Sequence, residues 1–495
     1  MILAIALFII ASLLEIILNI GFLWHYKKYL AGLLILLLSI STGLIFGYHI
    51  SWFSAILVIL TVYRIINLLR LIEARINKNY LAITFRKTSF WLMLFQSILA
   101  IVWLLVIDIK INRNIILLIS STLILVCSMV IAIFISSNLQ KIQVKAHLKN
   151  MPSSKLPSLS VLIPARNETE SLNDCLASLV SSTYPKLEII VLDDCSQNKH
   201  TPEIIKDYAH AGVRFIAGQA TPDNWLAKNY AFEQLSEQAS GEILLFCGVD
   251  VRFSENSLTQ IVEILLSNNK VMLSLLPNNL IQNQQELSKL ITQPFRYGWE
   301  LIRSRDSQRK PPVLSTCWCI KANELSKSGG FKAVTKTIIP ERYFAKLANS
   351  KNNGYLFFKM LGDQNITSLK AFDEQKATAI RTKYPELHKR IELVASLSII
   401  QTAIFIMPVY LLILGIINSL YIVGLLSFIT LIINLLSYLT LSKLTFNRFI
   451  IQAIVYWPVA IIFDIILVNQ SMWQYEFRQV IWKGRNICIP IMKSV

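Results

Sequence analysis

Residues 158–196 read SLSVLIPARNETESLNDCLASLVSSTYPKLEIIVLDDCS, and this stretch decides the fold of the chain. The apolar, β-branched run at 160–164 predicts a buried strand that ends at a proline. Thr169 is placed to cap the next helix, whose apolar face we expect over 173–179. A second apolar run at 187–192 predicts another strand, so the stretch has the pattern of a β-α-β unit.

The second predicted strand ends on two carboxylates, Asp193 and Asp194. In an open parallel sheet, ligands bind at the edge where the strands have their carboxyl ends. Carboxylates at this edge can accept hydrogen bonds from a base N–H or from ribose hydroxyls. A turn with an exposed acidic pair is the alternative explanation, but the β-α-β context favours a nucleotide site.

Three segments carry a resemblance to a known family: PARNE at 164–168, VLDDCS at 191–196 and PDNWLAKNYA at 222–231. They resemble the nucleotide-binding half of family 2 glycosyltransferases, which have the GT-A fold. Within that family they are most similar to the membrane-bound branch that acts on lipids such as hopanoids, carotenoids and ceramide. The resemblance extends over about 158–383 and returns in the tail at 482–485.

The resemblance implies the fold class: an α/β GT-A domain, the Rossmann-like nucleotide-diphospho-sugar transferase fold, inserted between N-terminal and C-terminal transmembrane α-helices. It implies an inverting transfer of one sugar from a nucleotide-diphosphate donor, a UDP-sugar above all, to a lipid acceptor. It also implies that Pro164, Arg166, Glu168 and Asp193 line the nucleotide pocket.

The segment Asn224-Trp225-Leu226-Ala227-Lys228 resembles the family's G-W-x-G-K, in which the lysine lies near the donor diphosphate. An ammonium group is a suitable point charge for phosphate. This chain has Asn224 and Ala227 where the family favours glycines, and a lone lysine is usually solvated surface. The expectation that Lys228 binds the diphosphate therefore rests on the surrounding residues.

The run at 242–247 predicts a further buried strand, which Gly248-Val249-Asp250 follows. The family places a D-x-D motif here, whose carboxylates hold a divalent metal ion together with the diphosphate. Mn²⁺ and Mg²⁺ take oxygen ligands and share them between protein carboxylates and substrate phosphates. Because Gly248 replaces the first aspartate, the resemblance implies that Asp250 is the metal ligand and leaves dependence on the metal open. A turn residue at a strand end is the alternative for Asp250.

An inverting transfer needs a general base that takes the proton of the acceptor hydroxyl. In the family this base is the aspartate of an E/D-D-x-x-[LF]-A segment that follows a G-G-F turn. Residues 329–331 supply the turn here, and aligning the F-A step of 339–347 places Glu341 at the base. Pro340 occupies the position at which the family has the acid that precedes the base. The alternative is a purely structural role at a helix N-terminus, with Pro340 at its start and Glu341 in its first turn. The catalytic and the structural role can hold together.

The 495 residues are 54% hydrophobic, which is too apolar for a soluble enzyme. The apolar residues gather before 137 and after 395, in runs long enough to cross a bilayer. Candidate spans precede the soluble segment, and further apolar runs follow it. They are 2–24, 30–48, 52–69, 90–107 and 115–135, then 395–417, 420–441 and 449–468.

The formal net charge of +18 would suit nucleic acid if it lay on one soluble face. Here many basic residues lie in short loops beside apolar spans, which favours an integral membrane protein with no nucleic-acid partner. Alternating these loops puts the N-terminus outside and the soluble domain in the cytoplasm, at the cell membrane. The basic tail should also be cytoplasmic, so one C-terminal run is expected not to cross. The first of them, which contains Pro408, is the candidate for an interfacial or re-entrant segment.

These boundaries divide the chain into a transmembrane region, a linker or interfacial segment, a cytoplasmic GT-A domain, C-terminal transmembrane or interfacial helices, and a basic tail. The ranges are 1–136, 137–157, 158–390, 391–470 and 471–495.

Three residues in or beside the spans have expected environments of their own. Arg64 lies near a basic end and is expected to snorkel to the interface. Asp464 is expected to face protein or water. Trp482 is flanked by cations in a segment that resembles the family's W-[KR]-G-R tail; such a residue suits the headgroup layer, and interfacial anchoring alone would explain it.

The Q-x-x-R-W box of processive polysaccharide synthases does not occur, because Gln375 and Arg381 do not have its spacing. We therefore favour a single transfer over a polysaccharide synthase, and a polyprenyl-phosphate sugar transferase stays open. A catalytically degenerate, nucleotide-sugar-binding membrane protein is another reading, for which Gly248 and Pro340-Glu341 are the evidence. A transporter with an inserted regulatory domain is the last hypothesis, suggested by the extra N-terminal spans. The lack of paired charged residues and of Gly/Pro-broken helices in these spans counts against it.

Overall fold

The computed structural model describes most of the chain. The described residues are 2–20, 27–48, 52–76, 89, 92, 93, 95–97, 99, 113–142, 152–168, 170–302, 310–350, 354–360, 366–446 and 449–487. The chain divides into two compact units, Met1–Ile116 and Leu117–Val495. The expected helix cap at Thr169 and most of the expected span at 90–107 lie outside the described residues.

The first unit is helical where it is described. Its long helices are α1 (Ile2–Ile20), α2 (Lys27–Tyr48) and α3 (Trp52–Ile76). α1 packs against α2, and α2 packs against α3. Apolar side chains such as Phe8 and Leu34 are buried between them, while Ile9 and Leu36 are exposed on the outside. A helix that is apolar on all sides suits a lipid environment.

A buried ion pair lies inside this first unit. Arg64 of α3 donates from Nε to Oε2 of Glu15 in α1 at 2.5 Å, and neither side chain is exposed. Arg64 also donates to Oε1 of Gln96 at 3.0 Å. The expectation that Arg64 snorkels to the interface is therefore wrong, because its charge is neutralised between helices. The premise that the spans lack paired charges is wrong as well.

The second unit is built on a seven-stranded sheet in the order β3-β2-β1-β4-β8-β6-β9. Strands β3, β2, β1 and β4 run parallel, and β8 is antiparallel to both β4 and β6. In chain order the strands are β1 (Leu159–Ala165), β2 (Leu187–Asp193), β3 (Val213–Ala217), β4 (Ile243–Cys247), β6 (Met272–Leu275), β8 (Cys317–Lys321) and β9 (Tyr355–Phe358). The strands predicted at 160–164, 187–192 and 242–247 are confirmed as β1, β2 and β4.

Helices cover both faces of this sheet. Successive strand residues point to opposite faces, so Val161 and Leu162 of β1 belong to two different apolar cores. The first core includes α6 (Glu170–Val180), α7 (His200–Asp207) and α9 (Ser257–Ser267), and the second includes α8 (Ala227–Gln238), α11 (Ala322–Lys327) and α12 (Pro340–Ser350). The helix predicted around 173–179 is confirmed as α6. The carboxyl ends of β1, β2 and β4 consequently meet at one open edge.

Two small sheets lie beyond the main one. β5 (Val251–Arg252), β10 (Thr367–Ser368) and β7 (Asn278–Asn279) form one, in the order β5-β10-β7. The tail forms the other, an antiparallel hairpin of β11 (Ile481–Trp482) and β12 (Arg485–Asn486). Its turn residues Lys483 and Gly484 have φ angles of 46° and 78°. A two-residue turn with positive φ at both positions is type I′, which is why glycine is favoured there.

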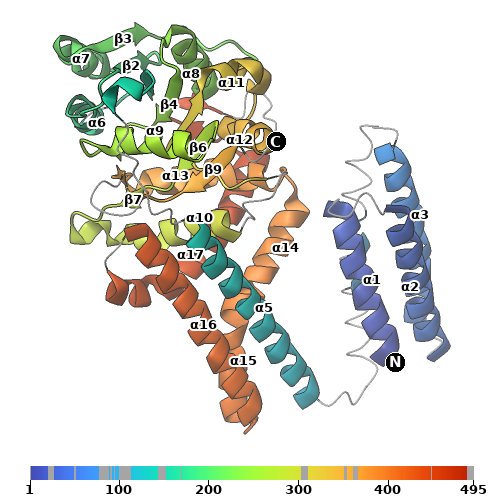
Figure 1. Cartoon of the computed structure of the whole chain (residues 1–495). Coiled ribbons are helices and arrows are strands. Elements are labelled where there is room, and N and C mark those ends of the chain that lie inside the picture. Colours follow the sequence, from blue (N-terminus) through green and yellow to red (C-terminus); the bar gives the residue numbers. More distant parts are fainter. Residues whose placement is uncertain are drawn as a thin grey trace. The chain divides into compact units, whose positions relative to one another are not determined.

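Long apolar helices accompany the sheet in the second unit (Figure 1). They are α5 (Arg113–Ile142), α14 (Ile391–Gln401), α15 (Met407–Ile417), α16 (Tyr421–Phe446) and α17 (Ile450–Phe477). Two further helices, α10 (Lys289–Ile302) and α13 (Phe372–Glu386), pack on them: α10 on α16 and α17, and α13 on α17. The hydroxyl of Tyr438 in α16 donates to the carbonyl of Leu290 in α10 at 2.6 Å. Apolar packing and hydrogen bonds therefore join the long helices to the domain above them.

Six helices in the described ranges are long and apolar enough to cross a membrane by length and composition. They are Tyr29–Gly47, Ser54–Ile72, Asn114–Leu139, Ile391–Ile417, Tyr421–Phe446 and Ile451–Phe477. The C-terminal run that we expected not to cross is among them: α14, a π-turn at Thr402–Ile406 and α15 follow one another without a break. Its place in the membrane stays a prediction. Helix α5 reaches Ile142, beyond the boundary expected at 136.

Candidate active site

A cavity of about 190 Å³ lies at the carboxyl edge of β1, β2 and β4. Strand ends supply most of the residues that the sequence singled out, and the start of α8 supplies one more. The lining includes Pro164, Arg166, Glu168, Asp194, Lys228 and Asp250. The structure thus brings these predicted residues together, whereas Asp193 and Glu341 are not part of the lining found among the described residues.

The two carboxylates after β2 have different partners. Oδ1 of Asp193 accepts hydrogen bonds from the backbone N–H of Ser196 at 3.2 Å and from the Ser196 hydroxyl. Asp193 therefore closes the turn that follows the strand. Asp194 is only 8% exposed and its side chain lines the cavity. Asp193 fits the turn interpretation, and Asp194 fits the ligand-facing one.

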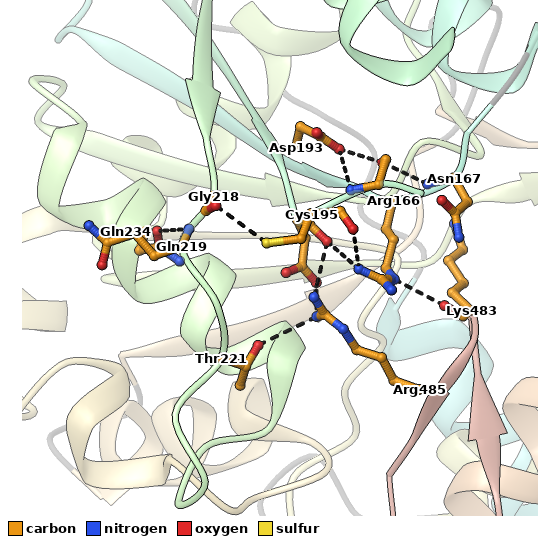
Figure 2. Close-up of polar contacts among 12 residues, drawn as sticks. Arg166, Asn167, Asp193, Cys195, Gly218, Gln219, Thr221, Gln234, Lys483 and Arg485 are labelled. Carbon is orange, nitrogen blue, oxygen red and sulfur yellow. Dashed lines mark hydrogen bonds and ion pairs between the residues drawn. The ribbon is translucent and has the colours of Figure 1, made fainter. Parts of the chain in front are cut away.

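Arg166 holds together the loops that form one side of the cavity (Figure 2). Its Nη1 donates to the carbonyl oxygens of Asp194 at 2.5 Å and Cys195 at 2.6 Å. Its Nε donates to the carbonyl oxygen of Lys483 in the tail at 3.0 Å. Burial lowers the pKa of Arg166, and the nearby Arg485 lowers it further. In this structure Arg166 is a clamp between the β2 loop and the tail hairpin.

Glu341 lies in the first turn of α12, where the sequence placed it, and it is completely buried. Its Oε2 is 3.7 Å from Nζ of Lys228. Neither carboxylate oxygen has a hydrogen-bond partner within the described part of the chain. A buried carboxylate without hydrogen bonds is costly and calls for a functional explanation. Burial lowers the pKa of Lys228, and Glu341 raises it.

A second cavity of about 280 Å³ lies beside the first, and Arg296 and Ser315 line both. Ile338 lines the first cavity and Ile339 lines the second. The segment that leads into Glu341 therefore runs between the two cavities.

The charged groups of the second cavity are largely paired. Asp464 of α17 accepts from Nζ of Lys383 at 2.6 Å, from Nε2 of Gln401 at 2.7 Å and from Nε1 of Trp299 at 3.2 Å. The expectation that Asp464 faces protein is confirmed. In the same cavity the guanidinium of Arg342 donates to Oε1 of Glu300 at 2.9 Å.

Asp250 and Gly248 both line the first cavity. Oδ2 of Asp250 accepts from the hydroxyl of Ser368 in β10 at 2.8 Å. A Cβ atom built on Gly248 would lie 2.6 Å from the other oxygen, Oδ1. Gly248 therefore leaves the space that the Asp250 carboxylate occupies.

The described residues contain no group of three or more His, Cys, Asp and Glu side chains that could hold a metal ion. Mg²⁺-type sites often use one or two carboxylates and complete their coordination with substrate phosphates and water. Asp250 fits this kind of site as a single carboxylate that lines the cavity. Lys370 is close enough to Asp250 for their charges to interact.

The cavity is lined by more cations than the sequence analysis assigned. The unassigned ones are Arg296, Lys370, Arg381, Lys483 and Arg485. With Arg166 and Lys228 they make seven cations against four carboxylates, Glu168, Asp194, Asp250 and Glu374, in the described lining. A concave site with an excess of positive charge attracts anionic ligands such as a diphosphate.

One of these cations had a signal in the sequence that was overlooked. Arg296 lies in Gln293-Pro294-Phe295-Arg296-Tyr297, which has the spacing of the Q-x-x-R-W box with tyrosine in place of tryptophan. The literal box does not occur, but this near match makes a processive enzyme less improbable than the spacing of Gln375 and Arg381 indicates. Lys370 has no local motif, and folding alone places it at the cavity.

Trp482 lies in the wall of the cavity. Its ring centroid is 4.1 Å from the guanidinium carbon of Arg381 and 5.8 Å from Nζ of Lys370. Both cations are within the range of a cation–π interaction. Interfacial anchoring in the headgroup layer therefore does not account for Trp482, because its ring is engaged inside the protein.

Comparison with known proteins gives a family for the sheet domain. Residues 160–322 match the family model described as glycosyl transferase family 2. The glycosyltransferase AglE of Haloferax volcanii is 35% identical over 102 residues, which are 20% of this chain and 32% of that protein. The 4,4′-diaponeurosporenoate glycosyltransferase of Staphylococcus haemolyticus is 36% identical over 107 residues, 21% of this chain and 28% of that protein. The matched part thus spans about a third of the length of these curated relatives.

Among solved structures, the mannosyltransferase PcManGT from Pyrobaculum calidifontis aligns with 73% of this chain and 100% of that chain, at 14% identity and a TM-score of 0.43. The family match spans the whole stretch from β1 to the end of β8, which includes the strand ends around the cavity. Residues 160–322 therefore resemble glycosyltransferase family 2, and helices apolar enough to cross a membrane lie on both sides of this stretch in the sequence.

Proposed function

We propose that this protein moves one sugar from a nucleotide-diphosphate donor to a hydroxyl group of a membrane lipid, with inversion, at the cytoplasmic face of the cell membrane. The observation that carries the proposal is the pair of neighbouring cavities. The first is rich in cations, and the second reaches Leu467 and Val468 of the apolar helix α17. A water-soluble donor and a lipid acceptor could therefore meet where the cavities share Arg296 and Ser315.

The first cavity suits the donor at both of its ends. Glu168 and Asp194 are carboxylates that can accept hydrogen bonds from a nucleoside, and a UDP-sugar is the donor we expect. Lys228, Lys370 and Arg381 can neutralise the diphosphate. The excess of cations supports a ligand with at least two negative charges.

The chemical step requires a base near the acceptor hydroxyl. In our proposal the diphosphate draws the ammonium of Lys228 away from Glu341, which leaves that carboxylate free to accept a proton. The acceptor oxygen then attacks the anomeric carbon while its proton passes to Glu341. The bond from the anomeric carbon to the phosphate oxygen breaks, and the electron pair leaves with the nucleoside diphosphate. A single displacement of this kind inverts the anomeric centre.

A divalent ion, Mn²⁺ or Mg²⁺, bound together with the donor would neutralise part of the diphosphate charge and stabilise the leaving group. Asp250 would be its protein ligand. The cations of the cavity lining act on the same charge, so we propose that the ion assists the transfer without carrying all of the neutralisation.

The second cavity favours a neutral hydroxyl acceptor over a lipid phosphate. Lys383 is paired with Asp464, and Arg342 is paired with Glu300. Lys310 donates to the carbonyl oxygen of Glu386 at 3.4 Å, and Arg296 also lines the first cavity, where we propose that it is engaged by the diphosphate. A lipid phosphate would require a further cation that is free to pair with it. The relative named a 4,4′-diaponeurosporenoate glycosyltransferase supports an acceptor other than a growing polysaccharide. A polyprenyl-phosphate transferase is therefore the second choice.

The test uses the full-length protein in nanodiscs made with lipids extracted from its own host cells. UDP-glucose, UDP-N-acetylglucosamine, UDP-galactose and GDP-mannose are supplied one at a time, and free nucleoside diphosphate and lipid masses are measured. We expect one donor to give nucleoside diphosphate together with a lipid that is heavier by one sugar residue. Binding of a donor with no release of diphosphate would support a degenerate binding protein instead. Repeated addition of sugars would contradict a single transfer.

A further inference from the structure

The C-terminal hairpin β11–β12 contacts the loops at the carboxyl edge of the sheet, although about three hundred residues separate them in the sequence. Nζ of Lys483 pairs with Oε1 of Glu168. Nη1 of Arg485 donates to Oδ2 of Asp194 at 2.6 Å, and Nη2 donates to the carbonyl oxygen of the same residue at 3.2 Å. The hairpin thus meets both carboxylates that the proposed function assigns to the nucleoside.

The hairpin is fixed from several sides. Arg166 donates to the carbonyl oxygen of Lys483 at 3.0 Å, and Arg485 also reaches Oγ1 of Thr221 at 3.4 Å (Figure 2). On the other side, the ring of Trp482 lies 4.1 Å from the guanidinium of Arg381. The type I′ turn at Lys483-Gly484 places the two cationic side chains and the ring at defined positions.

The carboxylates depend on these cations. The side chains of Glu168 and Asp194 are only 8% and 11% exposed. A carboxylate that is buried to this degree loses hydration and needs a partner to stay ionised. Each carboxylate can accept about four hydrogen bonds, so pairing with one cation leaves room for a ligand.

We propose that the hairpin is part of the donor-binding site, in which Arg485 and Lys483 position Asp194 and Glu168 to accept hydrogen bonds from the nucleoside end of the donor. This inference rests on the proposed function. Arg485 and Lys483 are positioning residues, since they act on the donor through the two carboxylates. Trp482 closes the wall beside the cations Arg381 and Lys370.

A plug that blocks the site is the opposite role for the same hairpin. The cavity keeps about 190 Å³ with the hairpin in place, and Trp482, Lys483 and Arg485 line this space. A plug would have to leave before the donor binds, so its removal would tighten binding. A positioning element has the opposite effect: weakening its contacts with the carboxylates weakens nucleotide binding.

The experiment measures affinity for UDP and for GDP by calorimetry on the full-length, detergent-solubilised protein. The variants are R485A, R485K and, as a control, R478A, which removes an exposed cation from the same tail. We expect R485A to weaken binding of the preferred nucleotide roughly tenfold or more, the effect of losing one hydrogen bond to a charged group. R485K should recover part of the loss, and R478A should bind as the parent does.

The dependence of affinity on pH separates positioning from general damage to the fold. Burial raises the pKa of Asp194, and its hydrogen bond from Arg485 lowers it. Without Arg485 the pKa of Asp194 rises, so R485A should lose affinity at a higher pH than the parent protein as the solution is acidified. A general defect in the fold would lower affinity at every pH and would not shift the pH at which affinity is lost.

Parent protein that binds UDP or GDP, together with R485A that binds equally well or more tightly, overturns the hairpin inference and leaves the proposed function in place. Parent protein that binds neither nucleotide overturns the proposed function, and the inference falls with it. R485K covers the case in which R485A does not fold, because a lysine retains the charge. The positioning role is excluded if R485K folds, binds the nucleotide as tightly as the parent protein and loses affinity at the same pH.

Discussion

Nζ of Lys228 lies 3.7 Å from Oε2 of the fully buried Glu341. The lysine side chain is 24% exposed and lines the donor cavity, whereas the glutamate lies behind it. A distance of 3.7 Å is longer than a hydrogen bond, so the pair is held by charge alone. Lys228 can therefore move to a diphosphate without breaking a hydrogen bond to Glu341. In the proposed mechanism, this arrangement would link donor binding to the release of the base.

The first prediction concerns Glu341 itself. E341Q keeps the shape of the side chain and removes the group that accepts the proton, so turnover should fall roughly a hundred- to ten-thousandfold. Affinity for the donor should be kept, because Lys228 no longer has to leave a charged carboxylate to reach the diphosphate. E203Q is the matched control, because Glu203 is an exposed acid in the first turn of α7. Sugar transfer and melting temperature are measured on the same preparations.

The alternative for Glu341 is a purely structural role at the start of α12. In that case E341Q should cost about 1 kcal/mol of stability with little kinetic effect, since the glutamate would act only on the helix dipole. Near-normal transfer by E341Q would exclude Glu341 as the base. E341D restores the residue type that the resemblance implies. Activity retained in E341D would show that the carboxylate matters more than its reach.

The second prediction concerns Asp250. D250N removes the proposed protein ligand of the metal ion, so UDP should bind more weakly in Mn²⁺ and the gain in affinity from Mn²⁺ should disappear. D207N, at an exposed position of α7, should behave as the parent protein does. Calorimetry with and without Mn²⁺ gives both quantities. If D250N binds UDP in Mn²⁺ as tightly as the parent protein does, Asp250 is excluded as a ligand of the metal ion.

The reverse change at Gly248 tests the same site. An aspartate there must displace the Asp250 carboxylate, because its Cβ would lie 2.6 Å from Oδ1 of Asp250. Oδ1 is the end of a flexible side chain, so the displacement is inexpensive. We expect G248D to leave UDP affinity in Mn²⁺ unchanged or to strengthen it. A marked loss would show that the cavity has no space for a second carboxylate.

The local sequence predicted the strands around the site well. β1, β2 and β4 lie within one residue of the predicted runs, because a buried strand needs a short, continuous apolar segment wherever it occurs. Which carboxylate after β2 faces the cavity could not be read in the same way. Adjacent residues at a strand end point in different directions, and the Ser196 turn that engages Asp193 forms only in the fold.

Contacts between distant segments account for the residues that sequence reasoning misplaced. Arg64 was expected at the membrane–water interface. Its partner Glu15 lies on another helix, so no local sequence pattern indicates the pair. Arg381 and Trp482 were judged separately, since no sequence box contains both. Their contact of 4.1 Å depends on how α13 and the tail hairpin are brought together. Spacing rules detect a site only where the chain supplies it from one segment.

The third prediction concerns orientation. Cys195 is exposed beside the proposed donor site, whereas Cys175 is buried, so Cys195 is the suitable reporter. If the domain faces the cytoplasm, an impermeant maleimide should label Cys195 only after the cell membrane is permeabilised. C195S, which lacks this thiol, identifies the labelled site. Labelling of Cys195 in intact cells would place the domain on the outside and contradict the orientation derived from the basic loops.

The fourth prediction is a pH dependence of donor binding that originates in Lys370. The pKa of Lys370 is lowered to about 8, because the effect of burial outweighs the opposite effect of the nearby Asp250. Only the protonated ammonium attracts the diphosphate, so affinity for UDP should be full below this pKa and fall as the pH rises through it. K370R keeps its charge over the same range and should flatten the curve near pH 8. K199R, at an exposed position, is the matched control and should retain the fall. A fall of the same size and midpoint in K370R would assign it to another group, such as Lys483, whose pKa burial also lowers to about 8.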